Sequence, residues 1–294
     1  MSITAKNLSF QYESGTPFSI NALQDINFTI QKGEFVGIMG HTGCGKSTLF
    51  QLLCGLLTPT DGTVFIDGND LFEHSYSRKK HRQDNKKSLR KKIGIVFQYP
   101  ENQLFETTVE KDVSYGLKHM NISVSEMEHR VQWALEQMGF CYETIRYLSP
   151  LSLSGGEKRR VAIAGILAIC PDYLLLDEPI AGLDPVMRMD FMNLLQKLNH
   201  QEKMTILMIS HNADCICDYT KRILILEKGH LIADDTTRHL FSDMDWITAH
   251  QLGTSQSRLI ASELQKQGLN IPKDVITYKE LLCSLQNILQ KNRD

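Results

Sequence analysis

Residues 40–47 read Gly-His-Thr-Gly-Cys-Gly-Lys-Ser, and the apolar run Phe35–Met39 (FVGIM) stands directly before them. The segment fits the phosphate-loop pattern G-x-x-x-x-G-K-[S/T], in which a strand leads in and a helix leads out. Glycines let backbone N–H groups turn inward around a phosphate, and the start of a helix adds the positive end of its dipole. We therefore expect an α/β fold with a P-loop NTPase core.

The phosphate-loop pattern also assigns tasks to individual residues. Lys46 is expected to reach the β- and γ-phosphates, and the Ser47 hydroxyl is expected to bind Mg²⁺. The nucleotide-contacting positions expected along this loop are Gly40, His41, Thr42, Gly43, Cys44, Gly45, Lys46, Ser47 and Thr48.

A second element of a phosphate site is the run Leu174–Glu178 (LLLDE), an apolar strand that ends in two acids. Asp177 suits Mg²⁺, directly or through water, and Glu178 suits the polarisation of an attacking water. The two elements together predict Mg²⁺-dependent hydrolysis of a nucleoside triphosphate. ATP is favoured over GTP because the sequence has no N-K-x-D guanine-reading motif.

Length and composition describe an ordinary globular chain. It has 294 residues, a formal net charge of −2 and 42% apolar residues, which argues against disorder and against a disulfide-held miniprotein. Seven cysteines without any C-x-x-C pair indicate neither a disulfide framework nor a zinc ribbon. No signal peptide is apparent, and the longest apolar stretch, Val161–Cys170, is too short to span a membrane. We expect a reduced, soluble chain whose membrane role, if any, runs through a partner.

Turn signals and apolar runs give the order of the elements. Continuous apolar strands suit a parallel sheet that is covered on both faces. Helix starts are marked by Ser123, by Ser154 in S-x-x-E register with Glu157, and by Asp184 before Pro185. The expected strands are Ile26–Ile30, Phe35–Met39, Thr63–Ile66, Ile93–Phe97, Tyr173–Asp177, Thr205–Ser210 and Arg222–Glu227, and the expected helices are Ser123–Gly139, Ser154–Ile169 and a helix from Asp184 to about Asn199.

Leu153–Glu157 (LSGGE) resembles the signature motif of ABC-type ATPases, and other elements follow in the order of that family. As the start of a helix, Ser154, Gly155 and Gly156 offer backbone donors to an anion. The resemblance implies that they serve the ATP held by a partner chain, so that a dimer is required. It also implies that Tyr12 stacks on adenine, that Gln98 senses Mg²⁺ and the membrane partner, and that His211 contacts the γ-phosphate. Glu178, His211 and Lys46 would then be the catalytic residues, and Ser47, Gln98 and Asp177 the metal-binding ones.

The segment after Gln98, Tyr99–Phe105 (YPENQLF), is similar to energy-coupling-factor importers, which take up vitamins and transition-metal ions. The stretches GHTG at 40–43 and GTPF at 15–18 look most like the second of that branch's two ATPase subunits. The resemblance implies a second ATPase subunit, a transmembrane coupling protein and a substrate-binding membrane protein as partners. It places the chain at the cytoplasmic face of the membrane, without a specific nucleic acid.

The resemblance divides the chain into an ABC-type ATP-binding domain at residues 1–240 and a helical C-terminal extension at 241–294. The ATP-binding domain is expected to include an antiparallel β lobe and a helical insertion at about 100–160. In the extension, a stripe spaced for one helix face is expected to pack on its own domain or to form a subunit contact. Its members are Tyr278, Leu281, Leu282, Leu285, Ile288 and Leu289.

Three positions depart from the commonest family pattern. Cys44 stands where serine is usual and is expected to place a thiol beside the phosphates, so that its alkylation blocks ATP binding. Ile180 replaces a threonine without an assignable consequence, and Glu157 replaces a frequent glutamine.

The run Arg78–Lys92 holds nine of the 32 basic residues and one acid. It is expected to be a solvated surface connection, with contact to anionic lipid headgroups as the second interpretation. The alternative function is a soluble ABC-type ATPase that acts on nucleic acid or ribosomes through this run.

Overall fold

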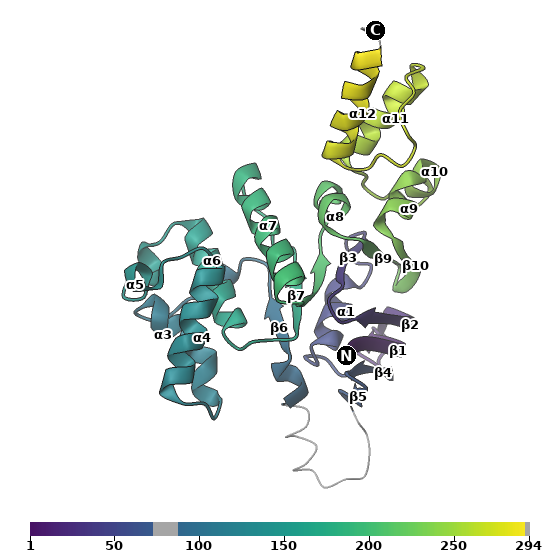
Figure 1. Ribbon diagram of the computed structural model, residues 1–294. Helices are drawn as coiled ribbons and strands as arrows, with labels where there is room; N and C mark the ends of the chain where they lie inside the picture. Colours follow the sequence, from purple (N-terminus) through teal and green to yellow (C-terminus); the bar gives the residue numbers. More distant parts are fainter. Residues whose placement is uncertain (73–87, 292–294) are drawn as a thin grey trace.

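Two β-sheets and a helical lobe make up the molecule (Figure 1). The computed structural model describes residues 1–72 and 88–291. The antiparallel sheet has the order β2-β1-β4-β5 and the larger sheet the order β10-β9-β3-β8-β7-β6. Within the larger sheet, all neighbouring strands are parallel except the pair β9 and β10. The strands are β1 (Ser2–Tyr12), β2 (Ile20–Gln31), β3 (Phe35–Gly40), β4 (Asp61–Ile66), β5 (Asn69–Asp70), β6 (Ile93–Val96), β7 (Tyr173–Asp177), β8 (Thr205–Ile209), β9 (Arg222–Glu227) and β10 (His230–Thr236).

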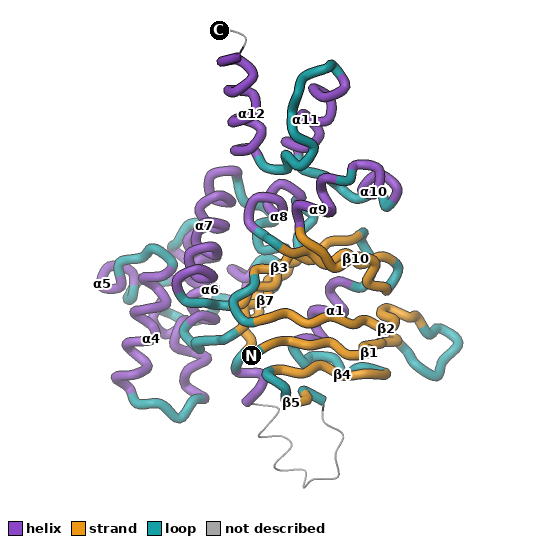
Figure 2. Tube along the Cα trace, turned by 45° about the vertical axis from the view of Figure 1, so that its right-hand side comes forward, coloured by secondary structure: helices purple, strands orange, loops and turns teal. Residues whose placement is uncertain are grey.

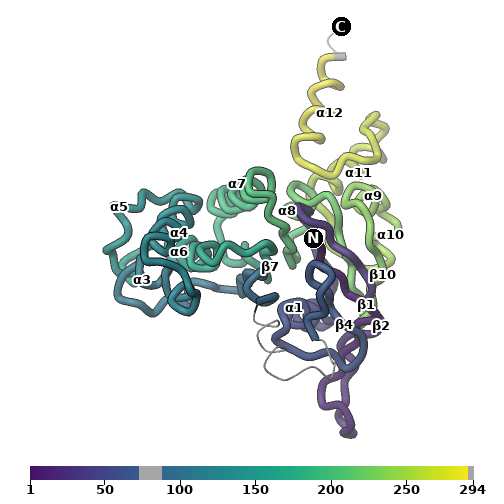
Figure 3. The backbone as a smooth tube through the Cα atoms, turned by 60° about the horizontal axis from the view of Figure 1, so that its bottom comes forward, coloured from purple at the N-terminus to yellow at the C-terminus, as the bar shows by residue number. Residues whose placement is uncertain are grey.

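The helices fall into three groups. Helix α1 (Lys46–Leu53) lies inside the core, and α7 (Pro185–Gln201), α8 (Ala213–Tyr219) and α9 (Thr237–Ser242) follow strands of the larger sheet. The helical lobe consists of η1 (Pro100–Gln103), α3 (Val109–Ser114), η2 (Tyr115–His119), α4 (Val124–Gln137), α5 (Tyr142–Ile145), η3 (Pro150–Ser152) and α6 (Gly155–Leu167). The chain continues through α10 (Met244–Ala249), α11 (Gln256–Lys266) and α12 (Tyr278–Lys291). Figure 3 shows the helical lobe projecting to one side of the β core, with α7 between them.

Side chains of the larger sheet alternate between two cores, because successive residues of a strand point to opposite faces. Leu174 and Leu176 of β7 join the core on the side of α6, α7 and the helical lobe. Tyr173 and Leu175 join the core that packs against α1 and the antiparallel sheet. The expected parallel sheet with two covered faces is confirmed, and with it the α/β class.

The predicted element boundaries agree with the structure to within a few residues for most elements. Ser123 and Ser154 cap α4 and α6, and Ser154 and Glu157 form a complete capping box. Asp184 caps α7 by accepting from two backbone N–H groups. β2 begins at Ile20, before the predicted strand start at Ile26, because its hairpin with β1 extends beyond the apolar run.

The chain after β10 packs in two ways. Phe241 and Ile247 belong to the main core, so α9 crosses the predicted boundary at residue 240 without an interruption of packing. A separate small core forms farther on, around Ala261, Ile271 and Leu281. Figure 2 shows α11 and α12 beyond the sheets, next to one another. The boundary itself remains a prediction.

The apolar stripe of α12 is only partly covered. Leu281 is buried, and Leu285 and Ile288 pack against the same small core. Tyr278, Leu282 and Leu289 are exposed. Packing on its own domain therefore accounts for one half of the predicted stripe.

Most of the basic run Arg78–Lys92 lies outside the described residues, so its role remains a prediction. Its described end is anchored: Arg90 donates to the carbonyl of Gly55, and Lys92 forms an ion pair with Asp67. Within the described part of the chain, no helix is both long and apolar enough to cross a membrane.

Asp67 joins the two sheets at one place. It lies in the turn between β4 and β5 and accepts hydrogen bonds from the Ser2 backbone, the Lys92 ammonium and the Tyr173 hydroxyl. Burial alone would raise the pKa of Asp67, but the bonds from Lys92 and Tyr173 hold the pKa below its usual value. This contact connects the antiparallel sheet to β7, the strand that ends at Asp177, directly before Glu178.

Replacement of Tyr173 by phenylalanine is expected to lower the free energy of unfolding by about 1–3 kcal/mol, because a carboxylate with little solvent access loses one of its donors. Thermal unfolding of the purified chain should show a melting temperature lower by several degrees. Tyr147→Phe is the matched control, since Tyr147 is 69% exposed. Equal melting temperatures for the two variants would contradict the role given to Asp67.

Candidate active site at the carboxyl ends of the parallel strands

The phosphate loop lies where β3 ends and α1 begins, and its backbone requires glycine. Gly40 has φ +149° and a Cβ there would lie 2.2 Å from the Leu226 carbonyl oxygen. Gly45 caps α1 with φ +105°, and a Cβ would lie 2.5 Å from the Ala22 carbonyl oxygen. Neither position has room for a side chain. The spacing of glycines in the sequence is thus explained by close approach to β9 and β2.

The Lys46 ammonium lies at the centre of this loop. It donates to the carbonyl oxygens of Gly40 at 2.7 Å and His41 at 2.8 Å. The side chain is 7% exposed, which leaves a buried cation held by loop carbonyls. A cation in a loop of inward-turned backbone suits an anionic ligand.

Around the loop is a cavity of about 470 Å³. Because parallel strands end at the same edge of a sheet, β3, β7 and β8 bring the loop, the two acids and His211 together there. Gln98 enters from the segment after β6, and Tyr12 from the end of β1. The predicted residues that line the cavity are Tyr12, Thr42, Gly43, Gly45, Lys46, Ser47, Thr48, Gln98, Asp177, Glu178 and His211.

Tyr12 is held at the rim of this cavity. Its hydroxyl lies 3.1 Å from the Thr48 hydroxyl, and its ring stands edge-to-face on Phe10, with centroids 4.8 Å apart. Tyr12 is 41% exposed and lines the cavity, so its ring is accessible to a flat ligand.

The two acids at the end of β7 differ from ordinary surface carboxylates. Burial raises the pKa of Asp177, and Lys46 opposes this shift. Burial and the neighbouring charge of Asp177 raise the pKa of Glu178 to about 7. Glu178 Oε1 accepts no hydrogen bond within the described part of the chain and lies 3.4 Å from His211 Nε2. A carboxyl group in this state can take up a proton near neutral pH.

The backbone of Glu178 is itself unusual. It has φ +47°, a left-handed conformation that is rare for a residue with a side chain, and its N–H donates to the Ile209 carbonyl at 3.0 Å. Strained backbone of this kind is concentrated at functional sites.

Burial also lowers the pKa of His211, with Lys46 and His41 adding to the effect, which favours the neutral imidazole.

Some predicted site residues lie elsewhere. His41 turns outward, and its Nε2 lies 2.9 Å from the His250 carbonyl oxygen at the end of α10. Cys44 is 5% exposed and packs in the core beneath the antiparallel sheet, and the prediction that its thiol stands beside the phosphates remains a prediction. The loop turns this side chain inward, with Sγ 3.8 Å from Lys46 Nζ.

Ser154, Gly155 and Gly156 do not line the cavity that holds the phosphate loop. Ser154 and Gly155 are exposed at the start of α6, and a Cβ on Gly155 would meet nothing within 4 Å among the described residues. The Glu157 carboxylate accepts from the Ser154 backbone at 2.9 Å. The start of α6 is therefore open to solvent and lies apart from this cavity.

Four residues that line the cavity are not predicted from the sequence: Ile20, Asn21, Ala22 and Ile209. Ile20 stands opposite Tyr12 in the β1–β2 pairing, so a correct hairpin register would have found it. No local signal marks the other three.

Comparison with known proteins agrees with this geometry. The family described as "ABC transporter" matches residues 23–181. "Energy-coupling factor transporter ATP-binding protein EcfA2" of Latilactobacillus sakei is 42% identical over 98% of this chain and 97% of its own length. The protein of the same name from Caldanaerobacter subterraneus is 43% identical, over 95% of each chain.

Solved structures give the same result. CbiO1 of Clostridium perfringens, described as part of the ABC transporter complex cbiONQ, superimposes with a TM-score of 0.72 at 36% identity, covering 84% of this chain and 93% of its own. The ATP-binding cassette MJ0796, in a dimeric post-hydrolysis state with ADP and Pi, has a TM-score of 0.67 at 31% identity, covering 80% of this chain and 98% of its own.

The chain belongs to the ABC transporter ATPase family. Relatives matched over nearly their whole length assign it, more narrowly, to the ATP-binding subunits of energy-coupling factor transporters, most like the second such subunit. It is an ATPase whose hydrolysis of ATP drives transport.

The buried position of Cys44 leads to a test with a maleimide reagent. The exposed thiols of Cys141, Cys170 and Cys283 should react first and leave ATP binding intact. Cys44 should react last, and ATP binding should disappear in step with its modification, since the adduct cannot fit in the core. Mass spectrometry of peptides over time, with ATP affinity measured on the same samples, checks the order. Full ATP binding after complete modification of Cys44 would contradict it.

Proposed function

We propose that this chain binds and hydrolyses ATP to power an energy-coupling-factor importer of vitamins or transition-metal ions. The observation that carries the proposal is the convergence of the phosphate loop, two half-buried acids, Gln98 and His211 on one cavity. In this account, adenine stacks on the exposed face of Tyr12, and the phosphates lie in the loop with Lys46. The relatives are transporter subunits, which favours this function over action on nucleic acid or ribosomes.

Glu178 is proposed as the general base. Its carboxylate accepts a proton from a water molecule as that water's oxygen forms a bond to the γ-phosphorus and the bond to the bridging oxygen of ADP breaks. His211, placed 3.4 Å from Glu178 Oε1 and with its pKa lowered, is positioned to donate to a γ-phosphate oxygen. A base with pKa about 7 is well matched to this task near neutral pH.

The side chains present also fit a magnesium ion. The cavity offers oxygen ligands near the loop, namely the Ser47 hydroxyl, the Asp177 carboxylate and the Gln98 amide, and such ligands suit Mg²⁺. When bound, the ion supplies charge neutralisation for the β- and γ-phosphate oxygens.

A second ATPase subunit is proposed to complete the site. The helix start at Ser154–Gly156 is exposed and lies apart from this chain's own cavity, as expected for a group that binds the ATP of a partner.

The membrane partner is proposed to dock on the helical lobe near Gln98, which would hold the chain at the cytoplasmic face of the membrane. Six apolar side chains are exposed there, and we call them the docking patch: Tyr99, Phe105, Tyr115, Tyr147, Leu148 and Leu151. Phe105 and Tyr115 stack edge-to-face at 4.9 Å, and the Leu148 carbonyl accepts from the Val109 backbone at 2.9 Å. An apolar patch of this kind marks a protein interaction site.

The variant Glu178→Gln should bind ATP with nearly unchanged affinity and form the ATP-bound dimer. Its turnover should fall by at least about 100-fold, because the amide cannot accept the proton. Single-turnover hydrolysis and nucleotide binding on the same preparation separate the two effects. Near-normal turnover in this variant would move the general base to another residue.

The variant Phe105→Asp should lose co-purification with detergent-solubilised membrane partners, since it places a charge in the docking patch. ATP binding by the isolated chain should not change. Val124→Asp is the matched control, because Val124 is 73% exposed but lies at the start of α4, outside the patch. Equal recovery of membrane partners with both variants would show that docking occurs elsewhere.

A further inference from the structure

We propose that Arg159 is a positioning residue that links the docking side of the molecule to the loop that follows the general base. Arg159 lies on α6 and touches two segments that are far away in sequence, one after Gln98 and one after Glu178. The inference rests on the proposed function, because it assigns a signal path from the docking patch to the hydrolytic site.

The first half of the link is an ion pair with Glu101. Arg159 Nε donates to Glu101 Oε2 at 3.0 Å, and Nη2 lies 3.3 Å from Oε1, so that both carboxylate oxygens are engaged. The Arg159 side chain is 3% exposed and that of Glu101 22% exposed. A two-point contact with restricted solvent access fixes the relative position of its partners far better than a surface ion pair does. Glu101 belongs to η1, which begins next to Tyr99 of the docking patch.

The second half is a pair of hydrogen bonds to the backbone after Glu178. Arg159 Nη1 donates to the Pro179 carbonyl at 3.1 Å and to the Ala181 carbonyl at 3.0 Å. These carbonyls lie one and three residues beyond the general base. The left-handed backbone of Glu178 is therefore continued directly by a segment that Arg159 holds.

A ring contact joins the same two segments a second time. The guanidinium carbon of Arg159 lies 6.0 Å from the centre of the Tyr99 ring. A Cβ on Gly182 would lie 3.7 Å from Tyr99 Cε1, which places the Tyr99 ring directly over the loop after Glu178. The segment that is proposed to receive the membrane partner and the segment that carries the base are thus in direct contact around one arginine.

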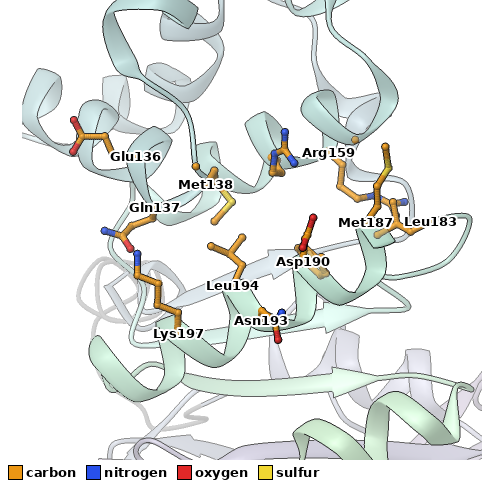
Figure 4. Close-up of a pocket in the computed structure, with 14 residues that line it drawn as sticks. Glu136, Gln137, Met138, Arg159, Leu183, Met187, Asp190, Asn193, Leu194 and Lys197 are labelled. Carbon is orange, nitrogen blue, oxygen red and sulfur yellow. The ribbon is translucent and has the colours of Figure 1, made fainter. Parts of the chain in front are cut away.

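Arg159 also lines a pocket between the helical lobe and α7. A pocket of about 450 Å³ separates the end of α4 and the start of α6 from α7. Figure 4 shows Arg159 beside Leu183 and Met187 at one end of this pocket, with Lys197 at the other. Arg159 therefore lines the end of this pocket that is nearest to Leu183, in the loop after Glu178.

Arginine is the residue that this geometry needs. Its planar group offers five donors in fixed directions, and here four bonds use Nε, Nη1 and Nη2 on two different segments. A lysine ammonium carries three donors at one point and cannot reach a carboxylate and two carbonyls in the same arrangement. When Glu101 moves upon docking, the Pro179–Ala181 backbone must follow or lose its donor.

The test uses the complete transporter in proteoliposomes with Arg159→Gln, Arg159→Lys, Glu101→Gln and the double variant Arg159→Gln/Glu101→Gln. ATP affinity should change less than about two-fold, because Arg159 does not line the nucleotide cavity. The kcat for ATP hydrolysis should fall by at least about ten-fold with little change in KM, since small misplacements of catalytic groups cost up to about 100-fold. Arg159→Lys should restore only a part of kcat, and the double variant should be no worse than Arg159→Gln.

Arg130→Gln is the matched control, because it removes an arginine–glutamate pair from the same lobe, Arg130 with Glu126 at 2.7 Å, away from both loops. A kcat within two-fold of the unmodified transporter in Arg159→Gln would overturn the proposal. So would fold-effects that multiply in the double variant, since the two residues would then act separately. If Arg159→Gln melts at a lower temperature, Glu101→Gln tests the same link from its other side.

The outcome also separates this proposal from the proposed function. If Glu178→Gln loses turnover while Arg159→Gln keeps it, only the role of Arg159 fails. If Glu178→Gln retains turnover, the assignment of the base fails, whatever Arg159 does.

Discussion

The rest of this structure depends on one requirement, which is that backbone N–H groups and one cation must surround a phosphate at the edge of a sheet. A loop can do this only if its backbone approaches β9 and β2 so closely that Gly40 and Gly45 tolerate no side chain. The larger sheet supplies the fixed edge, because its parallel strands end together at this point. Two cores hold that edge in place, one on each face of the sheet. The acids of β7, His211 after β8 and Gln98 after β6 then reach the same cavity through strand order alone.

A second helix start is proposed to bind a phosphate in the same way, although it does not line the chain's own cavity. The second helix start, at Ser154–Gly156, is capped by Ser154 and Glu157 and exposed to solvent. An exposed anion-binding helix start has a use if the anion is brought by another molecule. This explains why a family member with a complete set of motifs is proposed to need a partner for hydrolysis.

The sequence predicts those parts of the site that are set by local patterns. The phosphate loop, the two acids after Leu174–Leu176 and the caps at Ser123, Ser154 and Asp184 lie within a few residues of the elements they serve, so each could be placed correctly. Contacts between distant segments could not be predicted. Arg159 and Glu101 are 58 residues apart, and His41 meets the His250 carbonyl over 209 residues. The inward direction of the Cys44 side chain could not be predicted for a related reason, since the fit of the loop against the core decides it and no local pattern records that fit. Register shifts in the β1–β2 pairing likewise hid Ile20, which faces Tyr12.

The central claim is that the helix start at Ser154–Gly156 completes the ATP site of a second subunit. It is tested most directly by photocleavage of the transporter trapped with ADP and orthovanadate, because vanadate takes the place of the γ-phosphate and cuts the backbone next to it under ultraviolet light. Peptide mapping of this chain should find cuts in the phosphate loop at residues 40–48 and also at residues 154–156. Cuts confined to the phosphate loop, in a sample shown to be trapped, would contradict the account.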